Sequence, residues 1–249
     1  MPPPATAALQ GVSAHQLKVA CSGCGLRELC LPLGLSPTEL AAVERLIQRG
    51  QSIRKGQFLY RAGAAFGALY IVKAGCFKSS VVSEDGREQV TGFYMSGEMI
   101  GMDAISTERY TCSAIALEDG EVCELPFSRL ESLSQQIPAL QRHFYKLMSR
   151  EIVRDHGVML LLGNMKAEER LAAFLLNLSQ RFQCRGYSPR QFNLRMTREE
   201  IGSFLGLKLE TVSRLFSRFQ DDGLILVNNR QIELLDLPAL RRLFVNGQQ

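Results

Sequence analysis

The sequence predicts an α+β protein built from an N-terminal antiparallel β-roll of the cupin-like or jelly-roll type, one long helix, and a C-terminal winged helix-turn-helix. Three patterns carry this prediction. Residues 52–127 contain short apolar runs separated by glycines, residues 137–165 keep an uninterrupted helical periodicity, and residues 196–234 contain two short helical segments followed by a hairpin. The first pattern is typical of strands joined by turns, and the last is typical of a helix-turn-helix with a wing.

The composition fits a protein of two modest domains that folds without disulfide bonds. The chain has 249 residues, 46% of them hydrophobic, which is enough for two cores. The N-terminus lacks the apolar segment of a signal peptide, and the apolar run VMLLL at 158–162 is too short to cross a bilayer. Seven cysteines in an untargeted chain indicate a reducing compartment, where clustered thiols bind metal more often than they pair. We therefore expect a cytoplasmic protein with no membrane partner.

The positive charge is concentrated near the C-terminus. The formal net charge is +4, and residues 166–249 hold 13 Lys and Arg against 9 Asp and Glu, whereas residues 1–165 hold 16 of each. This surplus predicts a polyanionic partner for the last third of the chain.

The patterns divide the chain into four segments. Residues 1–19, which begin with the proline-rich MPPPATAALQ, are expected to form a flexible tail. Residues 20–135 hold a cysteine-containing arm and the β-roll sensor domain, residues 136–165 form a dimerisation helix, and residues 166–249 form the winged helix-turn-helix.

A short helix is expected between the cysteine arm and the roll. In SPTELAAVERLIQRG, Ser36 is the predicted N-cap, Pro37 occupies the first helical position, Glu39 closes a capping box, and Gly50 ends the helix. The expected strands of the roll lie in ALYIVK, CFKSSVV, EQVTGFY, CSAIAL and EVCELPF.

Heptad-spaced positions run along the long helix and form a seam on one side of it. Such a helix between two domains needs a partner surface, and a second copy of the chain is the simplest one, so we expect a homodimer. Asp155 then lies in the seam, where two carboxylates repel each other across the dimer. A register shifted by one residue would instead leave Asp155 in solvent. The seam positions alternate steps of three and four: Tyr145, Met148, Ile152, Asp155, Met159 and Leu162.

The segment MTREEIGSFLGLKLETVSRLFSRFQDDGLILVNNRQIEL predicts the helix-turn-helix and its wing. Thr197 and Glu200 form a capping box for the first helix, and Gly206 supplies the tight turn before a second helix at 209–220. Gly223 ends the second helix, and LILV-NN-RQIEL then predicts a hairpin with a two-residue turn. The predicted buried stripe of the second helix comprises Val212, Leu215, Phe216 and Phe219.

The opposite face of the second helix carries the chemistry of a DNA reader. Arg214 can donate two hydrogen bonds to guanine O6 and N7, Glu210 can accept one from a cytosine or adenine amino group, and Ser213 can bond or pack nearby. Ser217 shares this face, and Thr197 begins the first helix beside it. An ordinary solvated face would look similar in one helix, but the caps, wing and local charge agree with double-stranded DNA as the partner.

The thiols predict a metal centre of undecided type. Cys21, Cys24 and Cys30, spaced C-x2-C-x5-C, supply three ligands, and the fourth would come from the more distant cysteines. Four thiolates suit either an iron–sulfur cluster or structural zinc. The thiols that are not ligands are expected to be small buried hydrophobes. The candidates for the fourth ligand are Cys76, Cys112, Cys123 and Cys184.

Several segments together resemble one known family. They are the cysteine trio, LCLP at 29–32, GEMIGMDAI at 97–105, EVCELPF at 121–127, AEERLAAFLLNLS at 167–179, RGYSPRQFNL at 185–194 and LKLETVSRLFSRFQ at 207–220. From about residue 20 to 235 the chain is similar to the oxygen-sensing FNR and ANR regulators of the CRP/FNR superfamily.

The resemblance implies a function in some detail. It implies a [4Fe-4S] cluster held by Cys21, Cys24, Cys30 and Cys123, the last matching the family's VCE-I/L-PF segment. It also implies a homodimer that is stable only with the cluster, binding to a TTGAT-N4-ATCAA-like palindrome, and contact with RNA polymerase. In the family, an acidic residue matching Asp155 keeps the cluster-free protein monomeric.

Two residues depart from the family pattern. Gly25 follows the second cysteine where relatives often have Ser, a neighbour thought to tune how long the cluster survives in air. Arg87 lies in SEDGREQ at 83–89, which matches a polymerase-contacting loop that is usually acidic.

Other functional classes fit less well. A cyclic-nucleotide-responsive regulator needs an arginine near the end of the roll, and the corresponding segment is YTCSAIAL, so no cyclic nucleotide is expected. An iron–sulfur electron-transfer protein would leave the helix-turn-helix unexplained. With three histidines and no HExxH, GxSxG or P-loop pattern, we expect no enzyme. The alternative for the thiols is a zinc-stabilised or thiol-redox-responsive DNA-binding regulator of the same fold.

Overall fold

The computed structural model describes residues 21, 24–26, 29–31 and 34–245, so the predicted tail at 1–19 lies outside the described residues. Within the described residues, no helix is long and apolar enough to cross a membrane. The elements, in chain order, are α1 (Pro37–Leu46), β1 (Gln48–Ile53), β2 (Phe58–Tyr60), β3 (Ala68–Ala74), β4 (Cys76–Val82), β5 (Glu88–Met95), β6 (Met99–Ile100), the 3₁₀ turn η2 (Met102–Ala104), β7 (Ser113–Ala116), β8 (Gly120–Pro126), α2 (Phe127–Gln136), α3 (Pro138–Asn164), α4 (Ala167–Cys184), β9 (Gln191–Asn193), α5 (Arg198–Leu205), α6 (Leu209–Asp221), β10 (Ile225–Asn228), β11 (Gln231–Leu234) and α7 (Leu237–Val245).

The N-terminal unit is the predicted β-roll. It consists of two four-stranded antiparallel sheets in the orders β1-β8-β3-β6 and β2-β7-β4-β5. The five expected strands are β3, β4, β5, β7 and β8, while β1, β2 and β6 were not foreseen. The interior is filled by apolar side chains such as Leu69, Val72, Phe77 and Leu125, all fully buried. The predicted jelly-roll class is therefore confirmed.

The helix before the roll is shorter than predicted. Its capping box is present, because Ser36 N donates to Glu39 Oε2 at 2.8 Å and Ser36 Oγ accepts from Glu39 N. The helix nevertheless ends at Leu46 rather than at Gly50. Residues 48–53 instead form β1, which pairs with β8, so a long-range strand pairing outweighs the helical pattern.

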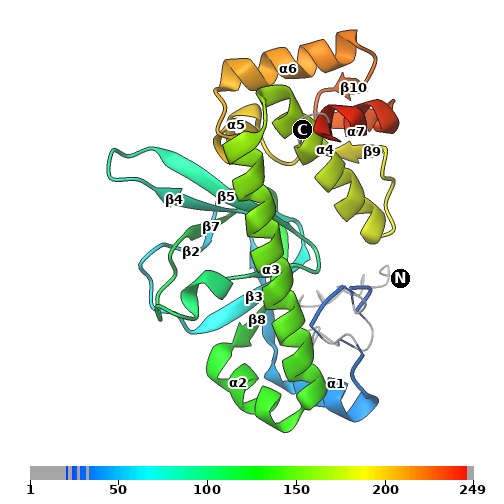
Figure 1. The fold of residues 1–249 in the computed structure, drawn as a ribbon. Coiled ribbons are helices and arrows are strands. Elements are labelled where there is room, and N and C mark those ends of the chain that lie inside the picture. The colour runs from blue at the N-terminus through cyan, green and yellow to red at the C-terminus, as the bar shows by residue number, and fades with distance from the viewer. Residues whose placement is uncertain (1–20, 22–23, 27–28, 32–33, 246–249) are drawn as a thin grey trace, which may run out of the picture.

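The long helix α3 spans the molecule (Figure 1). It runs beside the roll, from α1 and α2 at one end to the C-terminal unit at the other. Its observed range of 138–164 agrees with the expected 137–165. It therefore connects the two units as a single element.

The C-terminal unit is a winged helix-turn-helix. Its core includes Leu171, Ile201 and Phe219, and it continues onto β5 of the roll through Val90 and Phe93. The wing is the hairpin β10–β11, but its turn is Asn229–Arg230, one residue later than expected, because Asn228 pairs with Gln231. Asn229 adopts a φ of 56°, which asparagine tolerates better than most residues.

Candidate functional site

The helix-turn-helix geometry depends on a cap and two glycines. Thr197 Oγ1 accepts from Glu200 N at 3.1 Å, and Glu200 Oε2 accepts from Thr197 N at 2.8 Å, so the predicted capping box starts α5. Gly206 ends α5 in the left-handed region with a φ of 65°. Gly202 was not singled out from the sequence, yet a Cβ there would lie 2.6 Å from Leu207 O. The close approach of the turn to α5 therefore requires glycine at this position.

The reader face of α6 is exposed as expected. Its buried stripe packs inward, and the side chains of Glu210, Ser213, Arg214 and Ser217 lie on the outside, with Thr197 also exposed at the start of α5. Within the described part of the chain, neither Glu210 nor Arg214 takes part in an ion pair closer than 4 Å. Their charges are available to a ligand outside the chain.

A second basic residue supports the reader helix. The Arg198 guanidinium lies 3.1 Å from the centre of the Phe216 ring, which joins the start of α5 to α6. Burial lowers the pKa of Arg198 to about 10, so the side chain still carries a full charge at neutral pH.

The arm cysteines lie near Cys123 of β8. Cys21 and Cys123 are buried, and Cys24 and Cys30 are half-buried. Burial, with a smaller contribution from the nearby Cys123, Glu44 and Cys24, raises the pKa of Cys21 to about 12. Burial also raises the pKa of Cys30, and the nearby Cys21, Cys123 and Cys24 contribute to the same increase. Burial raises the pKa of Cys123 to about 11, opposed by Lys73. The four thiols are therefore within electrostatic reach of one another.

The other three cysteines belong to different surroundings. Cys76 is buried where Arg181 is its strongest charged neighbour, and Cys112 lies 3.4 Å from Asp103 and 3.9 Å from the Tyr60 hydroxyl. Cys184 is exposed at the end of α4, so the expectation that the remaining thiols are buried is wrong for this residue. None of the three is among the groups that shift the pKa of an arm thiol.

The donor set suits a soft metal centre. Burial raises the pKa of three of these thiols, Cys21, Cys30 and Cys123, and a metal would stabilise the group because coordination replaces the protons and neutralises thiolate charge. Among the described residues, no three His, Cys, Asp or Glu side chains are already spaced to hold a metal ion. The three arm thiols and Cys123 are therefore near one another, but their positions do not form a metal coordination sphere.

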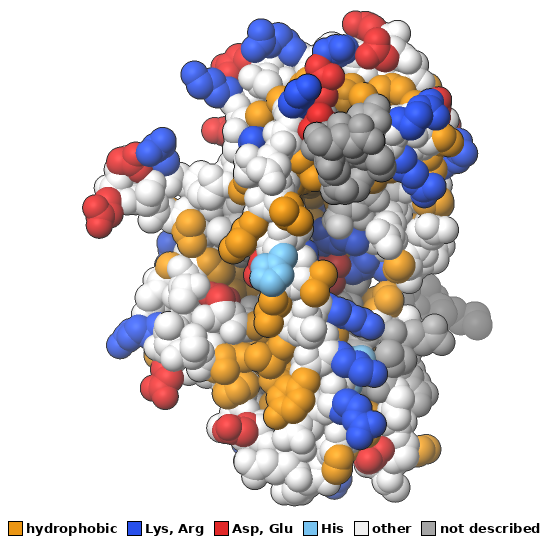
Figure 2. Space-filling view, in the orientation of Figure 1, with side chains coloured by type: hydrophobic (Ala, Val, Ile, Leu, Met, Phe, Trp, Pro, Cys, Tyr) orange, Lys and Arg blue, Asp and Glu red, His pale blue; other side chains and the backbone are white. Residues whose placement is uncertain are grey.

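The seam residues of α3 divide into two groups. Tyr145, Ile152 and Met159 are 54–68% exposed, and Asp155 is exposed with them, whereas Met148 and Leu162 are half-buried against the chain's own cores. Figure 2 shows hydrophobic side chains gathered along this helix. Two further exposed residues, Val153 and Leu160, widen the stripe and were not anticipated.

Comparisons with known proteins agree with this architecture. Residues 50–137 match the cyclic nucleotide-binding domain, and residues 169–243 match the Crp-like helix-turn-helix domain. The structure of FixK2 from Bradyrhizobium japonicum superposes with a TM-score of 0.73 at 31% identity, covering 78% of this chain and 96% of that chain. A CooA variant from Carboxydothermus hydrogenoformans, at a TM-score of 0.66 and 21% identity over 87% of this chain and 94% of that one, shares the fold.

Sequence relatives extend over most of the chain. The transcriptional activator Anr of Pseudomonas aeruginosa is 47% identical over 216 residues, 87% of this chain and 88% of that protein. The fumarate and nitrate reduction regulatory protein of Escherichia coli is 44% identical over 225 residues, 90% of both chains. These relatives are transcription regulators, whose superfamily binds DNA and dimerises. The chain therefore belongs to the FNR/Anr-type transcription regulators of the CRP/FNR superfamily and is not an enzyme.

Proposed function

We propose that the chain is an oxygen-responsive homodimeric regulator that holds a [4Fe-4S] cluster on Cys21, Cys24, Cys30 and Cys123. The observation that carries the proposal is the position of Cys123 on β8. Cys123 lies in the core against which Cys30 packs, and among the described cysteines outside the arm it is the one that raises the pKa values of both Cys21 and Cys30. When bound, the cluster supplies an oxygen-labile centre that four thiolates can retain. Cys30 also adjoins α3, because the His143 imidazole interacts with its main chain. Through this contact, cluster binding at Cys30 would change the packing of the dimerisation helix.

Dimer formation would follow from the exposed stripe of α3. Two copies would cover Ile152 and Met159, while Asp155 would bring two carboxylates together. Binding of the cluster must outweigh that repulsion, and oxygen would restore it by degrading the cluster. DNA affinity would then depend on oxygen through the monomer–dimer equilibrium.

The dimer would present two α6 helices to a TTGAT-N4-ATCAA-like palindrome. Two-fold symmetric readers match two-fold symmetric sites, and the exposed Arg214, Glu210 and Ser213 suit guanine and amino-group recognition. Transcription control would come from contact with RNA polymerase through the loop between β4 and β5. In this loop Arg87 Nε lies 2.5 Å from Asp85 Oδ2, so the unusual positive charge is paired.

A cyclic nucleotide is a poor candidate for the effector. The cavity between the roll and α3, about 320 Å³, is lined by three carboxylates, Asp103, Glu151 and Asp155. Its guanidinium, that of Arg154, is already paired with Glu151. An anionic cyclic phosphate would meet net repulsion there.

The deciding experiment is a visible absorbance spectrum of anaerobically purified protein before and after air, with iron and sulfide counted on the same sample. We expect a brown species with about four iron and four sulfide per chain that bleaches in air. The oligomeric state should change from dimer to monomer at the same time. A colourless protein holding one zinc per chain would contradict the proposal and favour a zinc-stabilised regulator.

A further inference from the structure

The turn at 96–98, between β5 and β6, lies against the cysteine arm. Gly97 has a φ of 88°, and a Cβ on it would lie 2.9 Å from the Cβ of Leu29, the residue before Cys30. Met99 is buried in the core that also contains Leu31 and Cys123. The arm therefore contacts Gly97 and shares a hydrophobic core with Met99, the two residues that flank Glu98.

Glu98 itself points to the DNA-binding unit. Its carboxylate accepts from Arg181 Nε at 3.0 Å and Nη2 at 2.5 Å, and from Arg185 Nη2 at 2.5 Å. Both arginines lie on α4, the first helix of that unit. We call Glu98, Arg181 and Arg185 the Glu98 ion-pair cluster.

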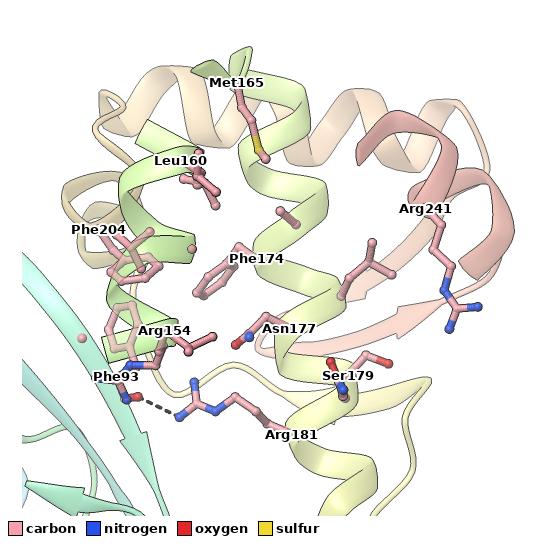
Figure 3. A pocket seen from close by; sticks show the side chains of 18 of the residues that line it. Phe93, Arg154, Leu160, Met165, Phe174, Asn177, Ser179, Arg181, Phe204 and Arg241 are labelled. Carbon is pink, nitrogen blue, oxygen red and sulfur yellow. Dashed lines mark hydrogen bonds between the residues drawn. The ribbon is translucent and has the colours of Figure 1, made fainter. Parts of the chain in front are cut away.

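The two arginines also bind the main chain of the roll. Arg181 Nη2 donates to Phe93 O at 2.7 Å, drawn as a dashed line in Figure 3, and Arg185 Nε donates to Ser96 O at 2.8 Å. Their side chains are 17% and 8% exposed. Burial raises the pKa of Glu98, but the two guanidiniums outweigh it and hold the pKa below its ordinary value. The carboxylate is therefore charged, and its orientation is set by both helical arginines.

The Glu98 ion-pair cluster lies at the edge of a cavity. A cavity of about 770 Å³ separates α3 from α4 above it, with Arg181 in its wall (Figure 3). Apolar contacts between the units include the aromatic group of Phe93, Phe174 and Phe204, with ring centres 5.3–6.0 Å apart. Aromatic rings at this spacing tolerate small rotations, whereas a carboxylate bound by two arginines does not.

We propose that Glu98 is the residue through which the cysteine arm positions the DNA-binding unit. Cluster binding to the arm then raises DNA affinity by fixing the orientation of the DNA-binding unit and its helix α6. This effect is in addition to the effect of the cluster on dimerisation. This inference rests on the proposed function, because it requires the cysteine arm to bind the cluster and gives that binding a second effect. Glu98 acts through Arg181 and Arg185 and does not touch DNA.

The test separates orientation from dimerisation by using an Asp155→Ala background that dimerises without the cluster. DNA affinity is measured by fluorescence anisotropy with and without the cluster, after iron, sulfide and sedimentation are measured on each sample. We expect the loaded dimer to bind DNA at least fivefold more tightly than the cluster-free dimer. Adding Glu98→Gln should reduce that ratio to about one, and the exposed control Glu108→Gln should leave it unchanged.

A second variant keeps the test decisive if Glu98→Gln folds poorly. Leu29→Gly removes the Cβ that approaches Gly97 and leaves the ion pairs in place, so it should also reduce the ratio to about one. A ratio that survives both changes, or a ratio of one in the Asp155→Ala parent, would overturn the proposal. Failure of the proposed function is distinguishable, because it would show as absent iron and sulfide or as a monomeric Asp155→Ala parent before Glu98 is altered.

Discussion

The hydroxyl of Ser203 on α5 accepts a hydrogen bond from the main-chain N–H of Val90 on β5 at 2.8 Å. The same hydroxyl donates to Glu88 O at 3.0 Å. Because β5 is at the edge of its sheet, these groups have no neighbouring strand to pair with. One side chain of the DNA-binding unit thus completes the edge of the sensor roll.

Ser203→Ala should weaken the attachment of the two units. The change leaves the N–H of the buried Val90 without its partner, which should cost about 1–3 kcal/mol, whereas the exposed Glu88 carbonyl can bind water instead. Urea unfolding followed by circular dichroism measures the loss. Ser132→Ala, which removes a hydroxyl from exposed α2, should change the stability by less than about 0.5 kcal/mol. Equal effects of the two substitutions would contradict the role of Ser203.

Cys123→Ser should abolish cluster retention, because it removes the one ligand supplied by the rigid sheet rather than by the arm. Cys76→Ser and Cys184→Ser are matched controls, since neither thiol adjoins the arm cysteines. Iron and sulfide content after anaerobic reconstitution measures the outcome. A requirement for Cys112 in place of Cys123 would show that the ligand assignment is wrong.

Local patterns in the sequence predicted the winged helix-turn-helix well. The capping box at Thr197, the left-handed Gly206 and the helical stripe of α6 depend on residues within a few positions of each other. The wing was placed one residue early because both NN and NR can form the turn, and only the pairing of Asn228 with Gln231 decides between them. Likewise, residues 48–50 of β1 were included in the preceding helix, because their partner strand β8 is about 70 residues away.

The contacts between the units could not be predicted in this way. Glu98 and Arg181 are 83 positions apart, and no spacing rule joins them. The same limit applied to the fourth thiol: four distant cysteines were equivalent candidates by spacing, and Cys123 was selected by the family resemblance alone. In the structure, the pairing of β8 with β3 and β1 puts this cysteine in the sheet beside the arm.

Asp155→Ala should produce dimers in air. Two carboxylates 4 Å apart repel by about 1 kcal/mol in water and about 4 kcal/mol at the effective dielectric of a protein surface, so their removal should strengthen dimerisation at least fivefold. Analytical ultracentrifugation of air-exposed protein measures the change. Glu84→Ala, which removes an exposed acid from the β4–β5 loop, should remain monomeric. A strictly monomeric Asp155→Ala protein would refute the seam interpretation.

Arg214→Ala should reduce discrimination at one base pair in each half-site. The loss of a bidentate guanine contact costs about 1–3 kcal/mol per half-site, and oligonucleotides with that base pair changed should no longer bind more weakly than the palindrome. Lys208→Ala is the matched control, because an exposed lysine that contacts phosphate should weaken all sequences alike and reduce the salt dependence. Fluorescence anisotropy at several salt concentrations separates the two effects. Uniform weakening by Arg214→Ala would show that Arg214 binds phosphate rather than a base.

Glu151 should make the stability of the cluster-free chain fall as the pH rises. Burial raises its pKa from an ordinary 4.5 to about 7, against the opposing effect of Arg154. Between these values the folded chain holds a proton that the unfolded chain has lost, so ionisation opposes folding, and the cost is complete above pH 7. The charged and polar groups around it are Arg154, Asp155, Glu98, Arg181 and Tyr94.

The free energy of unfolding in urea, measured from pH 5 to pH 8 at fixed salt, should therefore decrease by on the order of 1–3 kcal/mol. Glu151→Gln should flatten this dependence, because the amide does not titrate, whereas Glu108→Gln should preserve it. An unchanged slope in Glu151→Gln would show that another group binds the proton. A flattened slope would identify Glu151, one turn before Asp155 on α3, as a second acidic residue whose ionisation costs stability on the dimerisation helix.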